Sequence, residues 1–192
     1  EIFTDSNENE VQKQYEYCQG IILMIDPFAI PSVRFEYEKS MTPEDIAGIG
    51  KADINEVSNV FINKLRAVTG LSDTKMSKVP IAVVISKTDS AELHQKFSEE
   101  RINSFVNGRI DSKAVDRNDA IDHLCRRFLV DNGMESFLNT IDLQFKTNRY
   151  FFCSAIGHSR GHGSYAPYGV QEPVSWIISR ADKELSGILG IG

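Results

Sequence analysis

An apolar segment that ends in a polar tetrapeptide constrains this chain more than any other feature. Residues 79–89 have the sequence VPIAVVISKTD, in which a continuous apolar run gives way to Ser, Lys, Thr and Asp. Such a run is typical of a strand buried on both faces of a parallel sheet. Ligands of parallel sheets bind just beyond the carboxyl ends of the strands. The pattern therefore predicts a ligand site at residues 86–89.

Two other segments share this design. Residues 20–27 (GIILMIDP) end in Asp-Pro, and residues 149–157 (RYFFCSAIG) end in Ser-Ala-Ile-Gly. Long amphipathic segments separate the predicted strands, so the order is β-α-β-α-β-α. This alternation predicts an α/β fold, a doubly wound three-layer αβα arrangement with a mainly parallel sheet and right-handed crossovers.

Helix signals occupy most of the intervening sequence. Asp53, with Glu56 three residues later, predicts a capping box at a helix start, and Gly70 predicts its end. Further helices are expected over residues 10–19, 92–106, 119–131 and 134–145, and a last one from residue 172, which buries Trp176, Ile177 and Leu185. Residues 90–147 exceed what one crossover helix needs, which indicates a helical insertion.

Charge and cysteine content exclude several classes of function. The net charge is −6 and the chain has no dense Lys/Arg cluster, which argues against binding to nucleic acid or an anionic membrane surface. No apolar stretch approaches the ~20 residues that a membrane span needs. Cys18, Cys125 and Cys153 are widely spaced in apolar surroundings, a pattern typical of reduced core thiols in a cytoplasmic protein.

The carboxylate of Asp89 suggests what the predicted site binds. A carboxylate accepts two hydrogen bonds from neighbouring N–H donors of a planar base. Guanine presents such a donor pair on its Watson–Crick edge, whereas adenine places an acceptor beside a donor. Asp89 therefore predicts guanine recognition. The alternative is that Asp89 caps the helix or turn that follows.

The two polar loops together resemble the base-recognition half of a Ras-like (TRAFAC-type) GTPase. Residues 86–89 (SKTD) are similar to the family motif Asn/Thr-Lys-x-Asp, and residues 154–157 (SAIG) match Ser-Ala-x-Gly. Residues 169–178 (GVQEPVSWII) resemble the bacterial double-GTPase group. The resemblance covers roughly residues 5–186 and implies a partial P-loop NTPase (Ras-like) fold.

The resemblance also implies a role for each residue. Asp89 would pair with the guanine N1–H and exocyclic amine, while the stem of Lys87 would lie over the face of the base. The hydroxyl of Ser86, which replaces the usual Asn or Thr, would tie the two loops together. Ser154 and Ala155 would form the second loop, with the Ala155 N–H donating to the guanine carbonyl. The implied ligand is GTP or GDP, with Mg²⁺ bound only in a complete domain.

The phosphate-binding motif of this family is absent from the chain. The nearest match to Gly-x-x-x-x-Gly-Lys-Ser/Thr ends at residues 50–52 (GKA), but it has Asp45 in place of the first glycine and Ala52 in place of the hydroxyl residue. At the N-terminus, Asp5 fits a remnant of the Asp-x-x-Gly switch motif with Glu8 in place of glycine; a polar terminal segment is the alternative.

A glycine-rich loop follows the second motif. Residues 157–169 hold His158 and His162, but no Cys or carboxylate completes a metal site there. We expect no metal ligands and no catalytic residues in this chain. The loop is expected to border the base pocket, with Arg160 near the ligand.

These observations lead to one domain with two possible functions. We expect a single partial GTPase-like domain over residues 1–192. Residues 1–19 would be a switch remnant and helix, and residues 20–192 a βαβαβα core with an insertion at about 90–147. Since the chain starts at Glu1, we expect the C-terminal half to two-thirds of a longer domain. Its function would be to bind guanine nucleotides, and the chain by itself would be unable to hydrolyse GTP. The alternative is a nucleotide-free scaffold that binds a protein partner, or the missing N-terminal half, along an exposed sheet edge.

Overall fold

The computed structural model describes residues 17–41, 43–47, 49, 53–72, 74–106, 109–110, 113–157 and 164–191. Asp5 lies outside these residues, as do His158, Arg160 and His162. The helix predicted over residues 10–19 falls mostly outside them, and its last part, residues 17–19, is not helical.

The three predicted strands form one parallel sheet. They are β1 (Ile21–Ile25), β2 (Ile81–Ile85) and β5 (Asn148–Phe152), and their order in the sheet is β1-β2-β5. Ile21 pairs with Ile81, and Ile81 pairs with Asn148, so the three strands run in the same direction. All residues of β2 are buried, as the continuous apolar run predicts. The carboxyl ends of β2 and β5 therefore lie side by side.

Helices occupy most of the remaining chain. The α-helices are α2 (Pro31–Tyr37), α3 (Pro43–Ala47), α4 (Ile54–Thr69), α5 (Glu99–Val106), α6 (Arg117–Asp131), α7 (Glu135–Gln144), α8 (Gln171–Ala181) and α9 (Lys183–Leu189). The short 3₁₀ helices are η2 (Pro27–Ala29), η3 (Glu38–Ser40) and η4 (Ser90–Phe97). Strand β3 (Arg109–Ile110) pairs in the antiparallel direction with β4 (Lys113–Ala114).

Local signals set the ends of α4 as predicted. The Asp53 carboxylate accepts a hydrogen bond from the Glu56 N–H at 3.0 Å, which satisfies one of the free donors of the first turn. Gly70 ends the helix with φ at 62°, a conformation that glycine adopts without steric cost. The predicted start and stop of this helix are confirmed.

Two predicted helices differ from the structure. The helix expected over residues 92–106 is instead η4 followed by α5, because the extended backbone of Ser98 interrupts it. The last helix ends at Asp182, whose carboxylate caps the separate helix α9 by accepting from the N–H groups of Glu184 and Leu185. Leu185 is 41% exposed, so its predicted burial is wrong.

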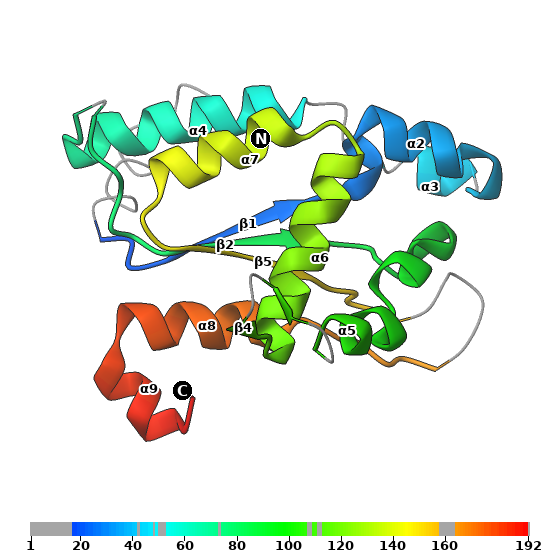
Figure 1. Cartoon of the computed structure of the whole chain (residues 1–192). Coiled ribbons are helices and arrows are strands. Elements are labelled where there is room, and N and C mark those ends of the chain that lie inside the picture. The colour runs from blue at the N-terminus through cyan, green and yellow to red at the C-terminus, as the bar shows by residue number, and fades with distance from the viewer. Residues whose placement is uncertain are drawn as a thin grey trace.

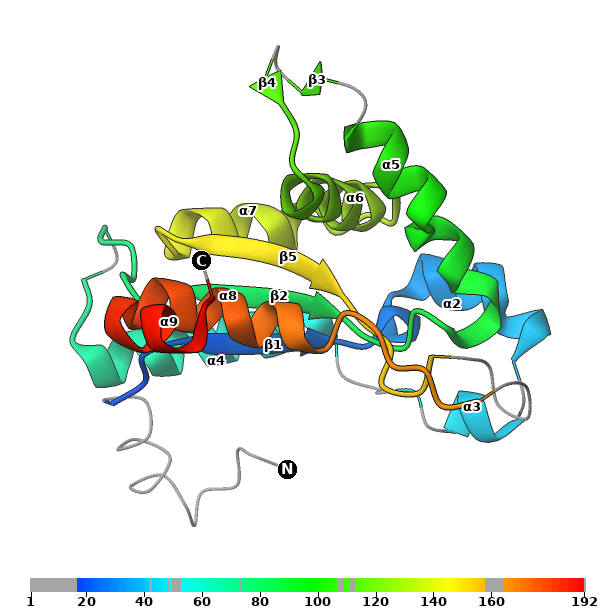
Figure 2. The ribbon, with the colours of Figure 1, turned by 90° about the horizontal axis from the view of Figure 1, so that it is seen from below.

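Helices lie on both faces of the sheet (Figures 1 and 2). The larger core lies on the face that packs against α4, α6 and α7, and it includes Ile81, Val83 and Tyr150. On the other face Trp176 and Ile177 of α8 pack against a small cluster made of Ala82, Val84, Phe151 and Cys153. The chain is thus an α/β protein with a small parallel sheet between helices, as predicted.

The second face is covered unevenly. Ile22 and Met24 of β1 point to the same side as Ala82 and Val84, their partners in β2. The β2 residues are buried beneath α8, whereas Ile22 is 42% and Met24 is 55% exposed. An apolar strip of β1 therefore remains open to solvent.

Candidate functional site

The candidate site is formed by two loops at the carboxyl ends of adjacent strands. We call residues 86–89 the β2 loop and residues 153–157 the β5 loop. The ladder between the strands continues into both, since the Cys153 N–H donates to the Ile85 carbonyl at 2.8 Å. The Thr88 N–H then donates to the Cys153 carbonyl at 3.3 Å. The structure thus places the two predicted loops in direct contact.

Ser86 binds the opposite neighbour of β2. Its N–H and its hydroxyl both donate to the Ile25 carbonyl, each at 2.9 Å, at the end of β1. The expectation that Ser86 ties the two loops together is therefore wrong. As the first residue after β2, Ser86 extends the β1–β2 ladder, so its hydroxyl lies beside β1 rather than β5.

Thr88 makes the connection that was expected of Ser86. Its side chain is fully buried, and its hydroxyl donates to the Cys153 carbonyl at 3.0 Å. The same hydroxyl lies 3.0 Å from the Tyr168 hydroxyl. A threonine hydroxyl has one hydrogen, so Tyr168 is the donor in this second bond. Sequence reasoning missed both roles, because position 88 is unspecified in the motif and Tyr168 lies in a loop.

Lys87 is held by a carboxylate that the sequence did not single out. Its backbone has φ at 54°, which is uncommon for a residue with a side chain. Its ammonium lies 2.7 Å from Oδ2 of Asp26, just beyond β1, and the other oxygen of Asp26 accepts from the Phe28 N–H at 3.1 Å. The Asp-Pro ending of the first strand was the available signal. The Lys87 side chain remains 46% exposed, so its stem is accessible to a ligand.

Asp89 lies at the end of the β2 loop and is 9% exposed. It occupies the position before η4, yet its side chain makes no capping hydrogen bond to that helix. Asp89 is part of a turn closed by the backbone, since the Ser90 N–H donates to the Lys87 carbonyl at 3.0 Å. The alternative explanation is therefore supported in part: Asp89 lies in the turn that starts η4, but its side chain does not cap that helix.

The β5 loop folds around the Ser154 side chain. Ser154 is fully buried, and its hydroxyl oxygen accepts from the N–H groups of Ile156 and Gly157 at 3.2 and 2.7 Å. Its backbone exchanges two hydrogen bonds with Tyr168, at 2.9 and 3.0 Å. Ala155, between these anchored residues, is exposed at the tip of the loop.

A cavity of about 510 Å³ lies beside the two loops. Asp89 comes to it from the β2 loop and Gly157 from the β5 loop, while Ser86, Lys87, Ser154 and Ala155 do not line it. Aromatic side chains form much of its wall, and Phe97 stacks on Phe152 with ring centroids 4.9 Å apart. The described lining residues also include Glu99, Arg117, Glu172 and Tyr168.

Charges around this cavity are partly compensated. Arg117 donates to Glu99 at 2.6 Å, and this hydrogen bond lowers the pKa of the Glu99 carboxyl and raises the pKa of the Arg117 guanidinium. Burial raises the pKa of the Tyr168 hydroxyl and of the Cys153 thiol, and the nearby Asp89 carboxylate raises both pKa values further. Tyr168 is therefore neutral near pH 7 and can act as a hydrogen-bond donor.

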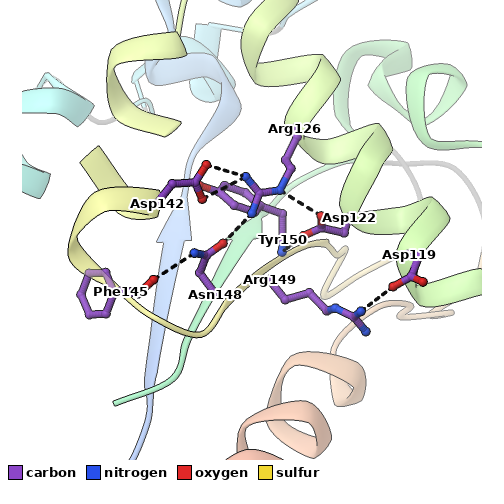
Figure 3. A network of polar contacts seen from close by, with 8 residues as sticks. All are labelled: Asp119, Asp122, Arg126, Asp142, Phe145, Asn148, Arg149 and Tyr150. Atoms are coloured by element: carbon purple, nitrogen blue, oxygen red, sulfur yellow. Dashed lines mark hydrogen bonds and ion pairs between the residues drawn. The ribbon is translucent and has the colours of Figure 1, made fainter. Parts of the chain in front are cut away.

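A separate polar network anchors the strand that carries the β5 loop (Figure 3). Arg126 of α6 donates to Asp122 at 2.9 Å and to Asp142 of α7 at 3.1 Å, and its guanidinium lies 4.3 Å from the centre of the Tyr150 ring. Asp122 also accepts from the Tyr150 N–H at 2.7 Å. These contacts join α6, α7 and β5.

Neither a metal site nor a membrane-spanning helix is found in the part of the chain that the structure describes. There, no group of three or more His, Cys, Asp or Glu residues is arranged to hold a metal ion. None of the helices described combines the length and apolar character required to cross a membrane.

Comparison of the chain with protein-family models, with curated proteins and with solved structures finds no match.

Proposed function

We propose that this chain binds guanine nucleotides through the β2 and β5 loops. The observation that supports the proposal most is the direct hydrogen bonding of the two loops through Thr88 and Cys153. This contact brings Asp89 and the Ser154–Ala155 pair to the same end of the sheet, where parallel sheets bind ligands. In this proposal the finer fold is Ras-like, with β1, β2 and β5 as the base-binding part of a P-loop NTPase.

The chemistry of each group suits a purine base. Asp89 is nearly buried and lies beside the cavity, and its carboxylate would accept from the guanine N1–H and exocyclic amine. The Ala155 N–H makes no hydrogen bond within the described residues and would donate to the guanine carbonyl. The partly exposed stem of Lys87 would cover one face of the ring.

The proposal concerns binding rather than hydrolysis. A phosphate-binding loop normally surrounds the phosphates with backbone N–H groups, and this sequence has no such motif. Without those contacts we expect a dissociation constant on the order of 1 mM for a nucleotide held mainly by its base. Mg²⁺ would bind only together with phosphate-binding segments.

A titration followed by NMR tests this proposal, because the method detects binding at millimolar ligand. GDP should shift the amide signals of residues 86–89 and 154–157, and ADP should not. Asp89→Asn should abolish the response to GDP and create one to xanthosine diphosphate, whose carbonyl replaces the exocyclic amine and accepts from the new amide. Asp131→Asn makes the same change at an exposed position of α6 and should leave GDP binding intact. Equal responses to GDP and ADP, or none, would contradict the proposal.

A second candidate function is that of an interaction module without nucleotide. Exposed Ile22 and Met24 favour it, because β1 pairs with β2 alone in the described part of the sheet and carries no charge. An apolar edge strand of this kind can pair with a strand of another chain, such as an N-terminal half of the same domain. The titration separates the two functions: binding of neither GDP nor ADP would favour the interaction module.

A further inference from the structure

We infer that Thr88 and Tyr168 form a positioning pair that orients Asp89 toward the base. The inference rests on the proposed function, since it assigns a role within the same site. Neither residue touches the ligand in this scheme. They act through the β2 and β5 loops, which they hold together.

Three hydrogen bonds to two partners fix Thr88. Its N–H and its hydroxyl both donate to the Cys153 carbonyl, at 3.3 and 3.0 Å, and the hydroxyl accepts from Tyr168 at 3.0 Å. The side chain has no exposed surface. Because Asp89 follows Thr88 directly, these bonds also fix the position of the Asp89 backbone from which its carboxylate extends.

Tyr168 links this arrangement to the other loop. Its backbone exchanges hydrogen bonds with Ser154, while its ring packs edge-on against Phe152 with centroids 6.1 Å apart. Gly169, next to it, has φ at 68°, and a Cβ there would overlap the Phe152 carbonyl oxygen. The segment that carries Tyr168 thus lies directly against the end of β5. Its side chain also lines the cavity beside Asp89.

Such anchoring matters most for recognition through two hydrogen bonds. A carboxylate that accepts from both the ring N–H and the exocyclic amine must have one orientation, and holding it there before binding reduces the cost of ordering. A loosened carboxylate can still accept one bond from either donor. Loss of the pair should therefore weaken binding of guanine more than it weakens binding of hypoxanthine, which lacks the exocyclic amine.

The experiment compares GDP with inosine diphosphate in NMR titrations of the whole chain. Thr88→Val and Tyr168→Phe should each weaken GDP binding about fivefold to tenfold, the range expected for a lost hydrogen bond, and inosine diphosphate binding by at most about twofold. Thr88→Ser keeps the hydroxyl and should restore the preference for GDP. Tyr165→Phe removes a hydroxyl from a residue that is 76% exposed in the same segment and should change neither affinity.

The outcomes distinguish this inference from the proposed function. If the wild-type chain binds GDP over ADP but Thr88→Val and Tyr168→Phe retain its GDP to inosine diphosphate ratio, only the positioning role is overturned. An equal loss for both ligands, with lowered thermal stability, would show a purely structural role and also overturns it. A wild-type chain that binds neither nucleotide overturns the proposed function and this role together.

Discussion

At the scale of single residues, the β2 loop connects three strands. Ser86 donates to the end of β1, Lys87 pairs with Asp26 just beyond β1, and Thr88 donates to the end of β5. The side chains of Ser86 and Lys87 thus contact the β1 side of the central strand, and the side chain of Thr88 contacts the β5 side. Asp89 follows as the residue whose position depends on all these contacts.

Gly169 should tolerate a side chain far less well than Gly133. Both have positive φ, 68° and 78°, so Ala at either site adopts an unfavourable backbone conformation that costs about 1 kcal/mol. A Cβ at Gly133 would meet nothing within 4 Å, whereas one at Gly169 would overlap the Phe152 carbonyl oxygen. We expect Gly169→Ala to lower the free energy of unfolding by about 3 kcal/mol. Urea denaturation measures both variants, and equal losses would show that the close approach to β5 is absent.

At the scale of elements, helix α6 joins the sheet to the rest of the larger core. Its apolar side chains, including Leu124 and Phe128, are buried, while Arg126 joins it to α7 and to Tyr150 of β5. Tyr150 is fully buried, and burial raises the pKa of its hydroxyl. The position of β5, and therefore of the β5 loop, depends on this helix.

Removing the charge of Arg126 should destabilise the protein more than the same change one residue later. Arg126→Met keeps an apolar stem but leaves Asp122 and Asp142 without their shared cation at a site that is 29% exposed. We expect a loss of about 2 kcal/mol in the free energy of unfolding. Arg127→Met removes an exposed pair 3.7 Å long and should cost less than about 0.5 kcal/mol. Chemical denaturation of the two variants side by side gives the comparison; similar losses would mean that the network in Figure 3 contributes little.

At the scale of the whole molecule, the two faces of the sheet are covered differently. One face packs against α4, α6 and α7, whereas α8 covers β2 and β5 more fully than β1 on the other. Parallel sheets are normally covered on both faces. The open strip of β1 is therefore the part of the described surface where a further chain segment would bury the most apolar sheet area.

This asymmetry predicts opposite results at two paired positions on one face. Met24 and Val84 are cross-strand partners, but Met24 is 55% exposed and Val84 only 1%. Met24→Lys should change the free energy of unfolding by less than about 0.5 kcal/mol, because the ammonium stays in water. Val84→Lys should prevent folding, because it buries an unpaired charge.

Circular dichroism during heating, combined with sedimentation at the same protein concentration, tests this prediction. A large loss in Met24→Lys would contradict it if the wild type is monomeric. If the wild type self-associates and the variant does not, the strip of β1 is a contact surface, as the interaction-module function requires.

The sequence by itself determined the elements and their order. Apolar runs of strand length, long amphipathic segments and capping residues such as Asp53 and Gly70 act over a few positions, so their patterns are legible without coordinates. The parallel arrangement followed from the alternation of these elements. The nearness of the two polar loops followed in turn, since both come directly after neighbouring strands.

Only the tertiary structure decided which groups meet. Ser86 binds Ile25, Thr88 binds Tyr168, and Lys87 pairs with Asp26, all across 61 to 80 positions of the chain. The separation of α8 from α9 at Asp182 and the exposure of Leu185 were equally unforeseen. Periodicity states which side of an element is apolar, but the partner of a polar side chain depends on distances between elements that packing alone sets.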